Sequence, residues 1–138
     1  MVFRTRGLER ATHQVGVYLQ EALRDLALTQ AEVHVLAHLA TEGPATVGEL
    51  HAGFGHRRST LTSVLDRLET RGLASRSVNP ADGRSIVVTL TASGATVADR
   101  ARVVIEDLER RVAEATSPAE QSGFLAVLDA IEHATEVP

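Results

Sequence analysis

The sequence predicts a mainly α-helical fold with one small β-hairpin, an α+β architecture. Three tetrapeptides have the pattern of a capping box, in which a hydroxyl side chain and a carboxylate three residues later satisfy the backbone amides at a helix start. Apolar stripes at helical spacing occupy both ends of the chain. Between them, residues 73–90 alternate apolar and polar side chains around a turn, which is typical of a hairpin. The capping-box pairs are Thr29 with Glu32, Thr46 with Glu49, and Ser117 with Glu120.

Four helices are expected before the hairpin, over residues 7–26, 29–41, 46–52 and 57–71. Glycine or Gly-Pro ends the last three of them. The first helix carries two series that repeat every seven residues, which makes a seam suited to packing along another helix. These series are Leu8, Val15, Ala22 and Thr12, Leu19, Leu26. The fourth helix has one apolar stripe, Leu61, Val64, Leu65 and Leu68, and leaves arginines and hydroxyls for its other faces.

The hairpin is expected to pair residues 73–78 with residues 85–90 and to present Arg84 near its tip. Pro80 and Gly83 supply turn geometry, and Asp82 can bond local backbone groups. Two more helices follow, over residues 92–115 and 117–134. Their apolar stripes and that of the first helix lie at the chain ends, outside a small core. A second copy of the chain is the simplest partner to bury them.

Composition excludes several classes of function. The 138-residue chain has no cysteine, so disulfides, thiolate metal sites and thiol redox sensing are excluded. It lacks an apolar run long enough to span a membrane and a signal-peptide core, so we expect a cytoplasmic protein with no membrane partner. It also lacks a Gly-x-Ser-x-Gly elbow, a phosphate-binding loop and a His-Glu-x-x-His motif. We therefore expect no enzyme activity and no cofactor.

The distribution of charge favours a nucleic-acid partner, although the formal net charge is −4. From Arg57 to Arg84 six arginines stand against three acids, and the flanking segments are acidic. A local basic patch is what phosphate binding requires. Arginines on a helix are often only a solvated surface. Here they are clustered with serines and threonines on a helix next to a hairpin with an arginine at its tip, which favours a winged helix-turn-helix that binds DNA.

The chain resembles the multiple-antibiotic-resistance regulator (MarR) family of transcription factors across nearly its whole length. The family pattern of Asp-x-Arg, three residues, an apolar residue, then x-Leu-Thr-x-x-Gly is matched by Asp82, Arg84, Val88, Leu90, Thr91 and Gly94. Residues 66–73 resemble the end of the family's recognition helix and the entry to its wing, and Leu28-Thr29 resembles the start of the helix before it. Where the family often has a capping serine, this chain has His56-Arg57-Arg58, so the first residue of the recognition helix stays open.

The resemblance implies one domain over residues 1–138, a homodimer of winged helix-turn-helix lobes. Residues 29–91 would form the DNA-binding lobe, and residues 1–28 and 92–138 the dimerisation helices. The recognition helix would enter the major groove and the wing arginine the minor groove of a pseudo-palindromic operator in double-stranded DNA. The DNA-contacting set carried over is Arg57, Arg58, Ser59, Thr60, Thr62, Ser63, Arg67 and Arg84, with Asp82 supporting the wing. Since Arg58 and Arg67 lie off the apolar stripe, replacing either should spare thermal stability.

The resemblance also implies repression by occlusion of a promoter and release by a ligand, often a small aromatic or phenolic acid. Candidate pocket residues are Tyr18, His34 and His38. The two histidines are four apart, a spacing that can bind zinc, and a zinc-sensing branch of the family has a histidine near His34. That branch draws further ligands from the helix after the wing, which has no histidine here, and Val33 stands where it has an acid. We expect no metal site, with zinc sensing and a winged helix that binds only protein as alternatives.

Overall fold

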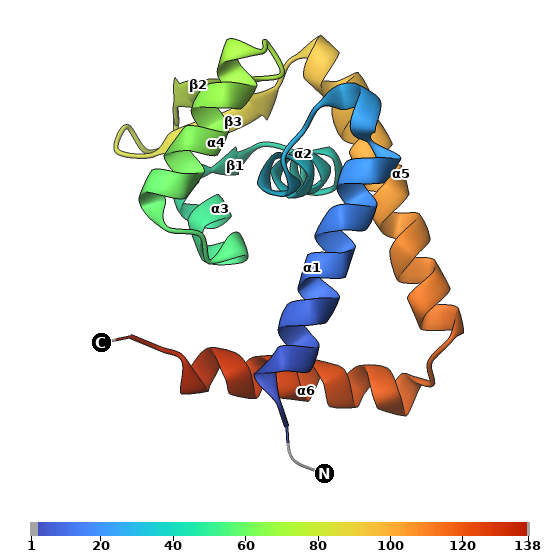
Figure 1. Ribbon diagram of the computed structural model, residues 1–138. Coiled ribbons are helices and arrows are strands. Elements are labelled where there is room, and N and C mark those ends of the chain that lie inside the picture. Colours follow the sequence, from blue (N-terminus) through green and yellow to red (C-terminus); the bar gives the residue numbers. More distant parts are fainter. Residues whose placement is uncertain (1–2, 138) are drawn as a thin grey trace. The chain divides into compact units, whose positions relative to one another are not determined.

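The computed structural model describes residues 3–137, and its helices and strands follow one another as Figure 1 shows. The elements are α1 (Thr5–Ala22), η1 (Arg24–Leu26), α2 (Gln30–Glu42), β1 (Ala45–Thr46), α3 (Val47–Phe54), α4 (Arg58–Thr70), β2 (Ala74–Val78), β3 (Ile86–Leu90), α5 (Ala92–Glu114) and α6 (Pro118–Ala134). The predicted class, mainly helical with a small hairpin, is confirmed. The chain divides into two compact units, one ending at Ile105 and the other beginning at Glu106. None of the described helices is both long and apolar enough to traverse a bilayer.

The sheet has three antiparallel strands in the order β1-β3-β2. The hairpin pairs β2 with β3, so that Arg76 faces Val88, and β1 adds Ala45 opposite Val88 on the other edge. Strand β1 was missed in the sequence because it has only two residues and its Thr46 reads as a helix cap. Ile86, expected on the inward face of its strand, is 38% exposed, whereas Val88 is fully buried.

The core of the first unit forms where apolar stripes from the helices meet one face of the sheet. Its largest fully buried side chains come from α1, α2, α3, α4 and β3: Leu19, Leu36, Leu50, Leu61, Leu65, Leu68, Val33, Val35, Val64 and Val88. Burying a side chain of this size contributes about 1.5–3 kcal/mol, so the apolar stripe of α4 holds that helix with its opposite face toward solvent. The helical spacing of apolar residues on α4 thus decides which of its side chains remain available for binding.

A glycine allows a close approach of two backbone segments in this unit. A Cβ at Gly94, in the first turn of α5, would lie 1.7 Å from the carbonyl oxygen of Leu73. Thr91 secures the approach: its hydroxyl donates to the carbonyl of Gly72 at 2.6 Å and accepts from the amide of Gly94 at 2.9 Å. The Leu-Thr-x-x-Gly pattern therefore joins the return strand and α5 to the entry of β2.

Two expectations about helix ends need correction. The first helix ends at Ala22 instead of residue 26, because a 3-10 turn and Ala27 in the left-handed region (φ 50°) redirect the chain. Two of the three capping boxes form as predicted, at Thr46 and Ser117. At the third, Thr29 caps the amide of Glu32, but the Glu32 carboxylate bonds Arg67 and the Thr29 hydroxyl rather than a backbone amide.

The second unit holds the end of α5 and all of α6. Its loop is fixed by Gln121, whose amide donates to the carbonyls of Ala113 and Thr116. Phe124 and Leu125, two apolar residues of α6, are 55% and 64% exposed. With Val112 they border an apolar groove of about 460 Å³. Among the described residues of this unit, Phe124 and Leu125 are thus left exposed.

Candidate nucleic-acid interface

Helices α3 and α4 form the helix-turn-helix. A complete capping box at Thr46 and Glu49 starts α3, and Gly55 ends it in the left-handed region at φ 63°, which favours glycine. The Phe54 ring packs edge-on against His38 at 5.5 Å and stacks on His56 at 5.9 Å between ring centroids. The Nδ1 atom of His56 is buried without a hydrogen-bond partner among the described residues. This aromatic contact holds the turn that aims α4.

The exposed face of α4 carries six of the predicted DNA contacts. Helix α4 begins at Arg58, with Arg57 as its N-cap residue, which answers the question left open by the sequence. Arg57 provides no side-chain cap within the described chain, so first-turn amides of α4 are left to solvent or to a ligand. The Ser63 hydroxyl donates to the carbonyl of Ser59 at 3.0 Å. These six predicted contacts are Arg57, Arg58, Ser59, Thr60, Thr62 and Ser63, and Arg67 on the same helix is exposed as well, at 49%.

The wing is closed by side-chain bonds to its own backbone. The Asp82 carboxylate accepts from the amide of Arg84 at 3.0 Å, and Asn79 accepts from the amide of Ala81 at 3.0 Å. The Asn79 amide group also donates to the Ser85 hydroxyl. These bonds shape the turn and leave the Arg84 side chain exposed at its end. Asp82 therefore acts on the backbone of Arg84 rather than on its guanidinium.

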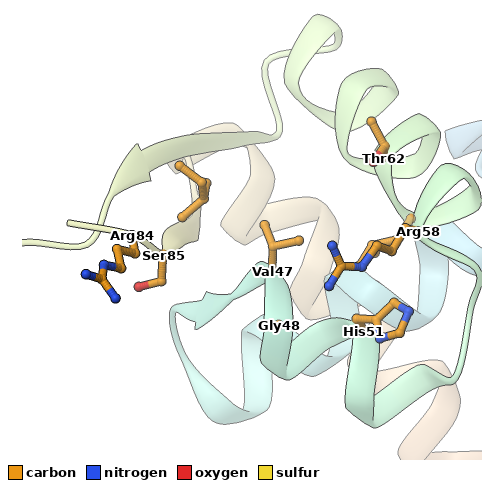
Figure 2. A pocket seen from close by; sticks show the side chains of 9 residues that line it. Val47, Gly48, His51, Arg58, Thr62, Arg84 and Ser85 are labelled. Atoms are coloured by element: carbon orange, nitrogen blue, oxygen red, sulfur yellow. The ribbon is translucent and has the colours of Figure 1, made fainter. Parts of the chain in front are cut away.

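The recognition helix and the wing face a common concavity of about 540 Å³. Figure 2 shows Arg58, from α4, and Arg84, from the wing, on opposite sides of Val47. The floor and walls are Val47, Gly48, His51, Leu61, Thr62, Ser85 and Ile86. Ile86, missed as a surface residue because strand alternation placed it inward, lies in this wall. Two exposed guanidinium groups therefore border one hollow.

Three of the six arginines in the basic block form ion pairs with acidic residues. Arg67 lies 3.0 Å from Glu32, and Arg76 on β2 binds both Asp66 and Glu69 of α4, at 2.6 and 2.7 Å. These carboxylates raise the pKa of Arg76, and the hydrogen bond that Arg76 donates to Glu69 is the largest cause. Arg71 lies 3.9 Å from Glu32 and also donates to the backbone carbonyls of Leu26 and Ala27. In the described part of the chain, the guanidinium groups of Arg57, Arg58 and Arg84 have no such partner.

Arg67, one of the residues expected to contact DNA, is held in an ion pair inside the lobe. The helical spacing correctly placed it off the apolar stripe, but its guanidinium is held by Glu32, which is only 3% exposed. The sequence does contain a sign of this ion pair: Glu32 is a carboxylate between apolar residues of the second helix. Its spacing from Thr29 also fits a capping box, so the sequence alone does not reveal a distant partner.

The three candidate pocket residues lie on two helices of the first unit. Tyr18 is on α1 and 37% exposed, while His34 and His38 are half-buried on α2. The contact with Phe54 places His38 beside the helix-turn-helix. Over residues 3–137, no group of three or more histidine, cysteine, aspartate or glutamate side chains is arranged to hold a metal ion.

Comparison with known proteins supports the resemblance to the MarR family. Residues 28–86 match the MarR family model. The HTH-type transcriptional repressor Rv2887 of Mycobacterium tuberculosis is 30% identical over 121 residues, which are 85% of this chain and 87% of that protein.

Two solved structures extend the comparison to the fold. A mutant of MarR from Escherichia coli, complexed with operator DNA, is 26% identical, with a TM-score of 0.73 and coverage of 92% of this chain and 91% of that one. Bordetella bronchiseptica BpsR, described as regulated in DNA binding by 6-hydroxynicotinic acid, is 25% identical, with a TM-score of 0.75 and coverage of 94% and 93%. The winged helix-turn-helix prediction is confirmed, and the chain belongs to the MarR family, whose members are transcription regulators and not enzymes.

Proposed function

We propose that this protein is a homodimeric repressor that reads a pseudo-palindromic operator with α4 and the wing. The observation that carries the proposal is the pair of unpartnered arginines, Arg58 and Arg84, that border one hollow from two elements. In this arrangement α4 would place Arg58 in the major groove, and the wing would place Arg84 in the minor groove. The hydroxyls of Thr62 and Ser59 stand beside Arg58 as hydrogen-bonding groups for phosphates or base edges.

Internal ion pairing narrows the set of residues proposed to contact DNA. Arg67, Arg71 and Arg76 are held by acids or carbonyls of the protein and stiffen the lobe. The residues left for DNA are Arg57, Arg58, Ser59, Thr60, Thr62, Ser63 and Arg84. Arg57 and the uncapped amides behind it offer donors to a phosphate at the positive end of α4.

The dimer is proposed to form through residues 1–28 and 92–138. The uncovered apolar side chains of the second unit, Val112, Phe124 and Leu125, give this part of the chain a reason to associate. Two lobes related by a two-fold axis would bind half-sites roughly 10 base pairs apart, one turn of DNA, since both α4 helices must face the same side of the duplex.

A small aromatic or phenolic acid is proposed as the effector, in keeping with the 6-hydroxynicotinic acid that the BpsR structure names. Tyr18, His34 and His38 are the proposed pocket residues. Imidazole and phenol groups can donate hydrogen bonds to a carboxylate while their rings contact an aromatic ring. Binding there would favour a separation of the lobes that no longer matches two successive major grooves.

The test is a fluorescence anisotropy titration of the purified protein with the region upstream of its own gene, repeated at several salt concentrations. Specific binding predicts tighter association with this DNA than with a shuffled duplex, and an affinity that falls with salt. Arg58→Ala and Arg84→Ala should weaken it. Arg24→Ala is the matched control, because it removes the same charge from a side chain that is 79% exposed and paired only with Glu21. Equal affinity of all four proteins would contradict the proposed interface.

A further inference from the structure

The connector between α1 and α2 is held by side chains from two other helices. It comprises η1 and the residue after it, Ala27, whose left-handed backbone (φ 50°) turns the chain toward α2. An alanine in this region is strained relative to glycine. The conformation therefore persists because neighbouring groups hold it.

Arg71, the C-cap residue of the recognition helix α4, makes one of these attachments. Its guanidinium donates to the carbonyl of Leu26 at 2.7 Å and to that of Ala27 at 3.2 Å. Nη1 of the same group lies 3.9 Å from the buried carboxylate of Glu32. The planar fork of arginine can reach two successive carbonyls at once, which a lysine ammonium does less well. The end of α4 is thus fixed to the connector itself.

Arg100 of α5 makes the second attachment, on the adjacent residue. It binds the Asp25 carboxylate with both nitrogens of its fork, at 2.7 and 3.0 Å. Three consecutive connector residues, Asp25 to Ala27, are therefore held by arginines from α4 and α5. Bidentate, charge-assisted bonds of this kind constrain direction as well as distance.

Arg67, one turn before Arg71 on the same face of α4, donates to the Glu32 carboxylate of α2. The two arginines thus fasten this face of α4 to α2 and to the connector. A change in the angle between α1 and the lobe would have to break the Arg71 bonds or move α4 together with the connector. The recognition helix and the helix that leads into the connector are therefore mechanically joined through one side chain.

We propose that Arg71 is a positioning residue that sets the direction of α4 relative to α1 and α5, and thereby the spacing of half-sites that the protein accepts. The proposal rests on the proposed function, because spacing has meaning only for a dimer on an operator. Arg71 contacts no DNA in this scheme. It acts through the carbonyls of Leu26 and Ala27, so its loss should change selectivity between spacings more than affinity for a single half-site.

The experiment measures binding to three duplexes that carry the same half-sites at the native spacing, one base pair shorter and one base pair longer. The wild-type protein should prefer the native spacing. Arg71→Ala should reduce this preference about three- to tenfold, the range expected when a coupling contact is removed. Arg71→Lys keeps the charge and should disturb the fold less than Arg71→Ala does. It should give an intermediate preference. The matched control, Arg24→Ala, lies on the same connector, and its only ion pair is with Glu21; it should keep the wild-type preference.

The outcomes separate this inference from the proposed function. If wild-type protein binds no duplex specifically, the proposed function fails. If it binds with a spacing preference, but Arg71→Ala and Arg71→Lys lower affinity by the same factor at every spacing, Arg71 is only a stabilising residue and the inference is overturned. Circular dichroism at the titration temperature confirms that each variant compared is folded. Should Arg71→Ala be unfolded, Arg71→Lys alone decides.

Discussion

Nε of Arg67 lies 3.0 Å from Oε1 of Glu32, so a side chain on the outer face of the recognition helix is bonded to a carboxylate inside the lobe. The hydroxyl of Thr29 donates to the same oxygen at 3.0 Å. Glu32 is 3% exposed and Arg67 is about half exposed, at 49%. A buried carboxylate needs such partners, because desolvation makes its charge unfavourable when it is unpaired. This pair fixes α4 to α2 through the guanidinium of Arg67.

Arg67→Ala is therefore expected to destabilise the fold, contrary to the expectation drawn from its position off the apolar stripe. Loss of the arginine removes one of the two side-chain hydrogen bonds to the Glu32 carboxylate, which keeps the Thr29 hydroxyl and, at 3.9 Å, the guanidinium of Arg71. We expect the free energy of unfolding to fall by about 1–3 kcal/mol in urea denaturation. Arg58→Ala, the control on the same helix, should stay within about 0.5 kcal/mol of wild type.

A double-mutant cycle tests the cause. If the effect comes from the lost bond between Arg67 and the Glu32 carboxylate, then Arg67→Ala made in a Glu32→Gln background should destabilise the protein less than it does alone, by about 0.5–3 kcal/mol. Strict additivity of the two changes would mean that the pair contributes nothing and that Arg67 stabilises the fold in some other way.

Arg58→Ala is expected to impair base recognition. If the arginine makes a bidentate contact to a base, its loss should cost about 1–3 kcal/mol of binding free energy and relax specificity at one base pair. A panel of single-base operator variants measures this. A loss of affinity that is uniform across the panel would place Arg58 on phosphate instead.

Arg84→Ala should affect binding without regard to sequence. A minor-groove arginine responds to groove width and negative potential more than to a base code. Affinity for operator and for random A·T-rich DNA should fall by similar factors, and the salt slope should flatten by about one ion per wing. Asp82→Ala should act in the same direction but more weakly, because it loosens the bond to the amide of Arg84. An unchanged salt slope in Arg84→Ala would remove the wing from the interface.

Gly94→Ala should be among the most damaging single changes in the chain. Its Cβ would lie 1.7 Å from the Leu73 carbonyl oxygen, a backbone atom that β2 and Thr91 hold in place. We expect a loss of at least about 3 kcal/mol in the free energy of unfolding.

Gly16→Ala on α1 is the matched control for this substitution. The new methyl group would meet Oε1 of Gln30 at 2.2 Å, but that atom ends a flexible side chain that can move away. Alanine also favours a helix interior over glycine by about 0.5–1 kcal/mol. This variant should be as stable as wild type or more so. Similar melting temperatures for the two variants would refute the close approach at Gly94.

The Asp25–Arg100 pair should contribute stability only above acidic pH. The hydrogen bond from Arg100 is the largest cause that lowers the pKa of Asp25 below its ordinary value of 3.8. A carboxyl group with a lowered pKa in the folded state stabilises above its unfolded pKa, and this contribution is lost as pH falls through the folded pKa. The melting temperature of Asp25→Asn should therefore lie below that of wild type at neutral pH. The difference should shrink below about pH 4. A difference independent of pH would exclude the ion pair as its source.

Charge on the apolar groove of the second unit should weaken the proposed dimer. Leu125→Glu places a carboxylate on a side chain that is 64% exposed beside Phe124, where an interface would have to desolvate it. Sedimentation velocity should show a shift from dimer toward monomer. Val78→Glu introduces the same group at a 59% exposed residue of the wing strand and should leave the dimer intact. A wild-type chain that sediments as a monomer at micromolar concentration would contradict dimerisation.

The amino-acid sequence by itself determined the features that depend on neighbouring residues. Capping boxes at Thr46 and Ser117, the glycines that end helices, and the Asp82 turn are local signals within a few residues of one another. Helical periodicity likewise placed the arginines and hydroxyls of α4 on the face opposite its apolar stripe. For these reasons the order of helices, the hairpin and the location of the candidate interface were predictable.

Only the tertiary structure decided which of those arginines are free. Arg67 meets Glu32 across 35 residues, and Arg100 meets Asp25 across 75, so no local spacing reveals either pair. The two-residue strand β1 exists because β3 offers it hydrogen-bonding groups, and it has no pattern of its own. A guanidinium group binds whichever carboxylate or carbonyl the packed helices bring within about 3 Å of it. That distance is set by the burial of apolar stripes on α2, α4 and α5, and it exists only once the core has formed.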